Sequence, residues 1–101
     1  MKKRMPTYIS LVNWTDQGIQ ELKESPARAD ATAELVERLG GKLVELYWTV
    51  GPYDIVAILE APDDETATAI QLTVGSRGSV RTTTLRAFGR EEIERIIAKT
   101  G

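Results

Sequence analysis

One short run in the middle of the chain has apolar residues on both of its faces. In an extended strand, Ile55, Ala57 and Leu59 point to one side, while Val56 and Ile58 point to the other. A strand that is covered on one side only alternates apolar and polar residues. The pattern therefore predicts a strand that must be covered on both faces.

Apolar periodicity and turn residues divide the rest of the chain into further strands and helices. Short runs rich in β-branched and aromatic residues predict strands, and apolar residues three and four positions apart predict helices. The predicted elements are, in order, a strand at Tyr8–Trp14, a short helix after Thr15 and Asp16, a helix from Ser25 to about Leu39, strands at Lys42–Thr49 and Ile55–Ala61, a helix opened by Ala61–Glu65 and closed by Gly75–Ser79, a strand at Val80–Phe88 and a helix at Glu91–Lys99.

Turn and cap residues set several of these boundaries. Pro26 interrupts the first helical stretch, and the hydroxyl of Ser25 is expected to cap the new helix that begins there. Gly40 and Gly41 supply a left-handed stop to that helix. The link at residues 50–53 is too short for anything except an antiparallel hairpin.

The order of elements is strand, helix, strand, strand, helix, strand, followed by an extra C-terminal helix. Right-handed crossovers convert this order into a four-stranded antiparallel sheet, arranged 4-1-3-2, with both long helices on one face. The sequence thus predicts an α+β, ferredoxin-like βαββαβ fold. We expect a single domain over residues 1–101, with residues 1–6 as a flexible tail.

One layer of helices leaves the second face of this sheet without cover. Leaving a large apolar side chain in water forgoes about 1.5–3 kcal/mol, and soluble proteins seldom expose a contiguous apolar patch. We therefore predict a homodimer or higher homo-oligomer that pairs through the helix-free sheet face. The alternative is that the C-terminal helix folds back over that face, although it is short for the task.

Composition narrows the chemistry that the chain can perform. The 101 residues contain no cysteine and no histidine. This removes disulfides, thiol and imidazole catalysis and nearly all structural zinc and haem ligand sets. We expect no catalytic residues, no bound metal and no cofactor.

The charge balance gives little attraction to nucleic acid or to anionic lipid. The net charge is −2 and the isoelectric point is near 5.2. RNA-binding versions of this fold stack bases on aromatic residues of the central strands, and the run at residues 55–61 has none. No apolar run approaches membrane-spanning length. We expect a cytoplasmic protein that binds neither nucleic acid nor membrane.

Two groups of residues are candidates for ligand binding. Gly51, Tyr53 and Asp54 form a tight hairpin, where Asp54 can bind a ligand amine in a dimer cleft or can simply close its own turn. Trp14 and Trp48 lie at strand ends, where aromatic rings either line a pocket or pack in the core or interface.

Three motifs carry a resemblance to a known family. The segments at residues 51–57, 60–64 and 80–88 read GPYDIVA, EAPDD and VRTTTLRAF, and together they resemble the GYD-domain family. The similarity extends from Tyr8 to about Lys99, and Pro52 interrupts the Gly-Tyr-Asp triplet. The resemblance implies a dimeric α/β-barrel architecture, and the family has no settled function.

A more distant similarity links the same motifs to the effector-binding domain of leucine-responsive and AsnC-type regulators. That similarity implies oligomers that bind amino acids between subunits. The chain has no room for the helix-turn-helix of those regulators, so we do not expect it to contact DNA.

Together these features favour a stand-alone, non-catalytic, homo-oligomeric domain that binds a small metabolite or regulates another protein. One alternative is a cofactor-free enzyme of the monooxygenase or isomerase kind. A cavity lined by Tyr8, Asn13, Trp14 and a carboxyl group with a raised pKa would favour the enzyme. A second alternative is a pure assembly module without a ligand, which would have a solid, pocket-free dimer core.

Overall fold

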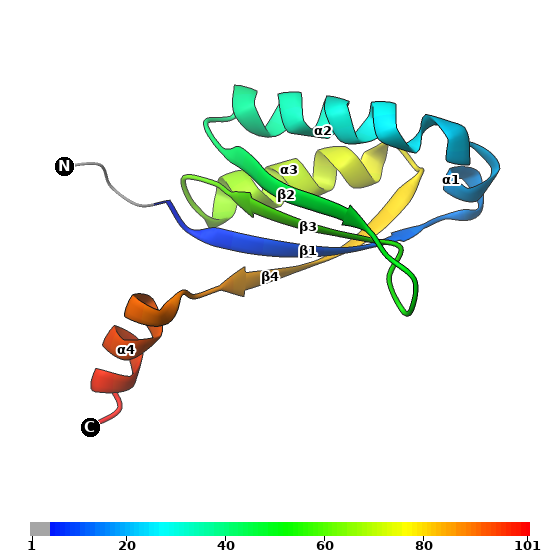
Figure 1. The fold of residues 1–101 in the computed structure, drawn as a ribbon. Coiled ribbons are helices and arrows are strands. Elements are labelled where there is room, and N and C mark those ends of the chain that lie inside the picture. The colour runs from blue at the N-terminus through cyan, green and yellow to red at the C-terminus, as the bar shows by residue number, and fades with distance from the viewer. Residues whose placement is uncertain (1–4) are drawn as a thin grey trace.

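The computed structural model describes residues 5–101 and contains four strands and four α-helices in that range (Figure 1). The predicted tail at residues 1–6 therefore lies largely outside the described residues. The elements are β1 (Thr7–Trp14), α1 (Asp16–Gln20), a 3₁₀ turn (Leu22–Glu24), α2 (Ser25–Arg38), β2 (Lys42–Trp48), β3 (Ile55–Glu60), α3 (Asp64–Ser76), β4 (Val80–Ala87) and α4 (Arg90–Ala98).

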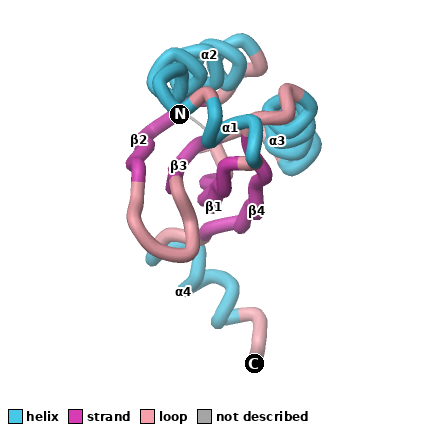
Figure 2. Tube along the Cα trace, turned by 90° about the vertical axis from the view of Figure 1, so that its right-hand side faces the viewer, coloured by secondary structure: helices cyan, strands magenta, loops and turns pink. Residues whose placement is uncertain are grey.

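The strands form one antiparallel sheet in the order β2-β3-β1-β4. This is the predicted 4-1-3-2 arrangement read from the other edge, so the ferredoxin-like fold is confirmed. Helices α2 and α3 both cover the same face of the sheet (Figure 2).

Both faces of β3 are apolar, but only one is buried. Ile55, Ala57 and Leu59 lie under the helices and are buried. Val56 and Ile58 point to the helix-free side and are only half-buried. The core under the helices consists of Tyr8, Leu35, Val36, Leu59, Ala61, Ala67 and Ile70.

Helix boundaries lie close to the predicted ones, and side chains cap the starts of α1 and α3. The hydroxyl of Thr15 accepts the amide of Gly18 at 3.2 Å, and the carboxylate of Asp63 accepts the amide of Thr66 at 2.8 Å. Gly40 has a φ of 87° where α2 ends. The expected cap by Ser25 is wrong, because Ser25 is the first residue of α2 and its hydroxyl forms no cap hydrogen bond.

Strand β2 contains a β-bulge that the sequence pattern did not reveal. Its register with β3 shifts between Leu43 and Glu45, so that Leu43 pairs with Leu59 and Leu46 pairs with Ala57. The extra residue brings both leucines to the helix-covered face, although their spacing in an unbroken strand would separate them.

Helix α4 does not cover the helix-free face. It leaves the end of β4 on that side of the sheet and projects away from the body (Figures 1 and 2). Ile93, Ile96 and Ile97 on α4 are 40%, 38% and 59% exposed. The alternative in which the C-terminal helix shelters the sheet is therefore not the arrangement adopted.

The contact between α1 and the start of β4 gives a stability prediction. A Cβ placed on Gly18 would lie 2.1 Å from the carbonyl oxygen of Ser79, whereas a Cβ on Gly75 would meet no atom within 4 Å. We expect Gly18→Ala to destabilise the fold by about 1–3 kcal/mol, because backbone must move to make room. Gly75→Ala should stabilise it by about 0.5–1 kcal/mol, because alanine favours a helix over glycine. Urea unfolding of both variants measures the difference, and equal effects of the two would contradict the contact.

Candidate functional site

The predicted hairpin site is held by hydrogen bonds within the loop and to β1. Within the loop, the amide of Thr49 donates to the carbonyl of Asp54 at 2.8 Å, and its hydroxyl donates to the carbonyl of Tyr53 at 2.6 Å. The amide of Asp54 donates to the carbonyl of Val12 at 2.8 Å. Gly51 has a φ of 139°, which glycine adopts more readily than any other residue. The hairpin is thus a fixed element.

The carboxylate of Asp54 joins this hairpin to the end of β1. Its Oδ2 atom accepts the backbone amide of Trp14 at 2.9 Å. Beside it, the Asn13 side-chain amide donates to the carbonyl of Pro52 at 2.9 Å. Asp54 therefore has a structural role in anchoring the strand end, and its role in ligand binding stays a prediction.

The two tryptophans lie on the helix-covered face but in different surroundings. Trp14 lines a cavity between the sheet and the helices. Trp48 is 47% exposed, and its indole Nε1 donates to the hydroxyl of Ser25 at 3.0 Å. The structure thus connects Trp14 with Asp54 and places Trp48 at the start of α2.

A cavity of about 310 Å³ lies between the sheet and helices α2 and α3. Small residues account for the space. Ser10 and Ala57 are direct partners in the two central strands, and Ala29 and Thr32 of α2 also line the cavity. Much of the remaining wall is apolar and includes Val12, Leu43, Leu46, Ile70, Val74 and Val80.

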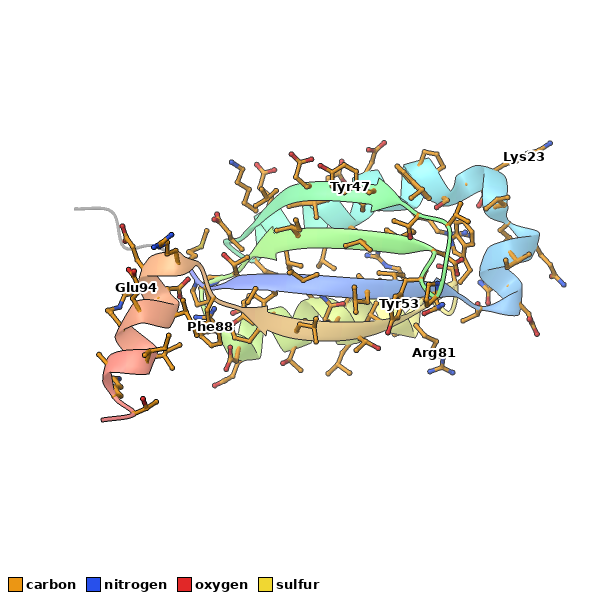
Figure 3. All side chains as sticks on the ribbon, turned by 60° about the horizontal axis from the view of Figure 1, so that its bottom comes forward. Lys23, Tyr47, Tyr53, Arg81, Phe88 and Glu94 are labelled. Carbon is orange, nitrogen blue, oxygen red and sulfur yellow. The ribbon has the colours of Figure 1, made fainter. Side chains whose placement is uncertain are left out.

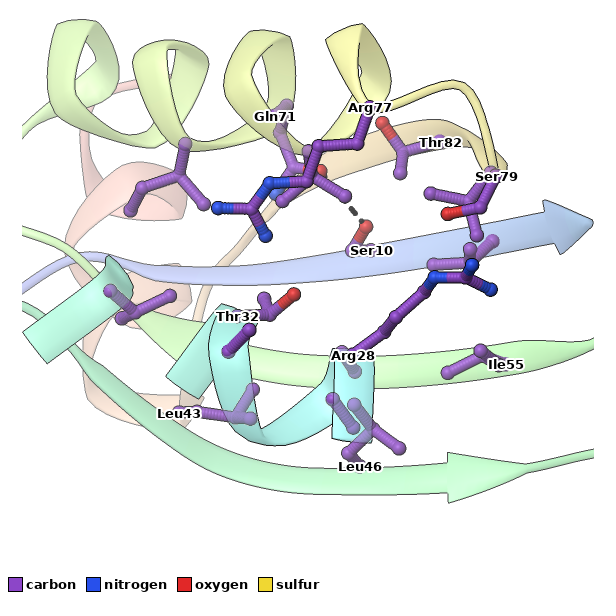
Figure 4. A pocket seen from close by; sticks show the side chains of 18 of the residues that line it. Ser10, Arg28, Thr32, Leu43, Leu46, Ile55, Gln71, Arg77, Ser79 and Thr82 are labelled. Atoms are coloured by element: carbon purple, nitrogen blue, oxygen red, sulfur yellow. Dashed lines mark hydrogen bonds between the residues drawn. The ribbon is translucent and has the colours of Figure 1, made fainter. Parts of the chain in front are cut away.

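Two arginines supply the charges at this cavity (Figure 4). Arg28 comes from α2 and Arg77 from the end of α3, and none of the cavity-lining residues carries a carboxylate. The hydroxyl of Ser10 donates to Gln71 Oε1 at 3.3 Å. Sequence reasoning missed this site. The available signal was the pair of small residues, Ser10 and Ala57, in strands that are otherwise rich in large apolar residues.

The lining does not match the arrangement that we expected for an enzyme. Of the residues named for that alternative, only Trp14 lines the cavity. Asn13 lies between Val12 and Trp14 on β1, so its side chain leaves the opposite face of the sheet from theirs. Its side-chain amide binds the carbonyl of Pro52 in the hairpin. Tyr8 instead lines a separate, more open depression, together with Asp64 and Arg86.

Tyr8 forms the most strongly perturbed titratable site in the described chain. Its side chain is 3% exposed, and its hydroxyl donates to Asp64 Oδ1 at 2.5 Å. Burial, followed by the hydrogen bond and the charge of Asp64, raises the pKa of Tyr8 to about 12. The guanidinium of Arg86 lies 5.7 Å from the centre of the tyrosine ring and opposes part of this shift.

The helix-free face carries two apolar rows across the sheet. One row joins Leu85, Ile9 and Ile58, and the other joins Leu11, Val56 and Tyr47. Leu85 and Tyr47 are 46% and 53% exposed. Figure 3 shows this face, with Tyr47 near one edge and Arg81 near the other. The apolar rows therefore face solvent in the isolated chain.

Residues 5–101 contain neither a membrane-spanning helix nor a cluster of metal ligands. No helix in this range combines the length and the apolar character needed to cross a membrane. Acidic side chains in the same range do not gather in groups of three or more that could hold a metal ion.

Comparison with known proteins adds a family and several relatives. The sequence profile of the GYD domain matches residues 8–97, which include the three motifs that carry the resemblance. The chain is 42% identical over 85 residues to a Thermus thermophilus protein named "Glutamine synthetase and cystathionine beta-lyase binding protein". That alignment covers 83% of this chain and 90% of the relative.

Two solved structures share the architecture. TTHA0845 from Thermus thermophilus superposes with a TM-score of 0.55 at 29% identity, over 84% of this chain and 95% of that one. The leucine response regulatory protein LrpA of Mycobacterium tuberculosis superposes with a TM-score of 0.58 at 14% identity, over 83% of this chain and 51% of that one. The likeness to LrpA shows a common fold.

The Tyr8 site predicts a specific loss of stability in alkali. The folded-state pKa of about 12 lies above the ordinary value of 10.0, so the unfolded chain loses its proton first. The contribution of this tyrosine is full below pH 10 and decreases by about 2–3 kcal/mol as the pH rises to 12. Tyr8→Phe should lower the free energy of unfolding by about 1 kcal/mol at neutral pH. It should also remove the decrease in stability that the ionisation of Tyr8 causes above pH 10.

Urea unfolding between pH 8 and about pH 12 tests the assignment. Asp64→Asn provides the control, because it removes the charge beside Tyr8 while burial still raises the pKa of the phenol. The decrease in stability of this variant at alkaline pH should lie between those of the parent and Tyr8→Phe. Identical pH profiles for the parent and Tyr8→Phe would contradict the assignment.

Proposed function

Because this chain belongs to the GYD-domain family, we propose that it is a non-catalytic, homo-oligomeric binding protein that attaches to enzymes of amino-acid metabolism in the cytoplasm. The observation that carries the proposal is its likeness, along nearly the full length of that relative, to a protein named for binding glutamine synthetase and cystathionine β-lyase. We infer partners of the same kind for this chain.

The helix-free sheet face supports pairing with a second copy. Its two apolar rows are flanked by polar and charged positions that include Glu45, Arg81 and Thr83. An apolar centre with a polar rim is the usual composition of a stable protein interface. A two-fold axis would place the same rows of the second copy against this face.

Helix α4 supports the same arrangement. Glu92 near its start accepts the amide of Gly89 at 3.0 Å and pairs with Arg86 at 3.4 Å, so the helix leaves β4 in a defined direction. The hydrogen bond from Gly89 is the main reason that the pKa of Glu92 is lowered. With its isoleucines exposed on the helix-free side, α4 is positioned to pack on the paired subunit.

Two features favour binding over the alternatives. Catalysis of the cofactor-free kind would call for a carboxyl group in the cavity, and the lining has none. A pure assembly module needs no pocket, and the cavity of about 310 Å³ beneath the helices supports a domain that holds a ligand. The hairpin at residues 51–54 stays our proposed contact for a metabolite between subunits, with Asp54 receiving its amine.

Substitution of Val56 tests the pairing. Val56→Arg places a charge in the middle of the apolar rows, and a symmetric interface would contain it twice. We therefore expect the dissociation constant of the dimer to rise at least about 100-fold. Light scattering coupled to size exclusion measures the mass. Leu72→Arg is the matched control, because Leu72 is 70% exposed on α3, which lies on the opposite face of the sheet. A parent protein that is monomeric at micromolar concentration would refute the pairing.

Purified enzymes test the partner assignment. We expect the chain to bind immobilised glutamine synthetase or cystathionine β-lyase of its own organism saturably, as measured by biolayer interferometry. If two subunits contact the multimeric enzyme together, Val56→Arg should weaken binding at least about tenfold through lost avidity. Leu72→Arg, on the helix-covered side, should dimerise and serve as the reference. Failure of the parent protein to bind either enzyme would contradict the proposed function.

A further inference from the structure

We propose that the cavity between the sheet and helices α2 and α3 binds a small carboxylic acid that carries no ammonium group, such as a 2-oxo acid. Arg77 would pair with the carboxylate, and the apolar wall would receive the carbon chain. The site lies on the opposite face of the sheet from the proposed dimer interface. The proposal therefore does not depend on enzyme attachment or on pairing.

The cavity is too large to be an ordinary packing defect. Protein interiors have few voids larger than a water molecule, whereas this one measures about 310 Å³, at the small end of ligand-binding pockets. Its cause is specific, because Ser10 and Ala57 face each other across the two central strands. Larger residues at those two positions would fill the space, as they do elsewhere on the same strands.

The charges at the cavity select an anion. Arg28 is already shared between Glu21 at 2.8 Å and Glu24 at 3.4 Å. Arg77 forms no ion pair with any residue between 5 and 101, and it is exposed at the mouth of the cavity. Figure 4 shows its side chain running from α3 across the cavity. A planar guanidinium in this position is suited to bidentate pairing with a carboxylate.

The polar groups inside the cavity favour an oxo or hydroxyl group over an ammonium group. Hydroxyls of Thr32 and Thr82 come from the lining and can donate hydrogen bonds to a carbonyl oxygen. An ammonium group in the same place would need an acidic partner, and the lining residues include none. The site should therefore discriminate between a 2-oxo acid and the amino acid with the same carbon skeleton.

Matched pairs of ligands test this discrimination on the full chain. The probes are 2-oxoisocaproate with L-leucine, 2-oxoglutarate with L-glutamate, and inorganic phosphate alone, each titrated by isothermal calorimetry and by amide-shift NMR. We expect at least one oxo acid to bind, its amino-acid partner to bind at least about tenfold more weakly, and phosphate to give no shifts around Ser10, because it has no carbon chain to fill the cavity.

Two variants and one control locate the site. Arg77→Gln, at an exposed position, should weaken oxo-acid binding at least about tenfold, and Arg38→Gln on the outer end of α2 should leave it unchanged. Thr32→Leu should fill the cavity, abolish binding and preserve or raise the melting temperature. The proposal is overturned if no oxo acid binds at about 10 mM, if the amino acids bind equally well, or if neither Arg77→Gln nor Thr32→Leu weakens binding.

Discussion

The alternation of side chains along the two central strands is the constraint on which this structure depends. Strand β3 pairs along its whole length with the first six residues of β1, and each strand sends apolar residues to both faces of the sheet. Helices α2 and α3 can cover only one face, because both crossovers of this topology have the same hand. The buried core and the exposed apolar rows both follow from this imbalance.

The helix-covered face does not simply maximise packing. Ser10 and Ala57 are neighbours in the centre of the sheet, where large side chains would bury the most surface. Their small size leaves the cavity, and the Ser10–Gln71 hydrogen bond satisfies the buried hydroxyl that replaces an apolar contact. The fold thus buries less apolar surface on its covered face than large residues would allow, and the remaining space is large enough for a ligand.

Local patterns were sufficient to predict the fold, because strand order follows from the sequence of elements and from crossover handedness. The caps at Thr15 and Asp63 were predictable for the same reason, since a side chain and its own helix form them. Contacts between segments that are distant in the sequence were not predictable from local patterns. Ser25 matches the pattern of a cap, but its hydroxyl accepts a hydrogen bond from the indole of Trp48 instead. The hydrogen bond between Tyr8 and Asp64 likewise joins residues that are 56 positions apart. The cavity was not predictable because it depends on which small residues meet across strands.

The two proposed binding sites lie on opposite faces of the same sheet. Ser10 lines the cavity while its neighbour Leu11 lies in an apolar row on the other face, and Ala57 and Val56 divide in the same way. A ligand on the helix side and a second subunit on the helix-free side would therefore contact alternate residues of the same two strands without competing for surface. Because interiors transmit displacement through packed strands, filling one face would also stiffen the backbone that presents the other. Only the thickness of the sheet separates the proposed ligand site from the proposed subunit interface.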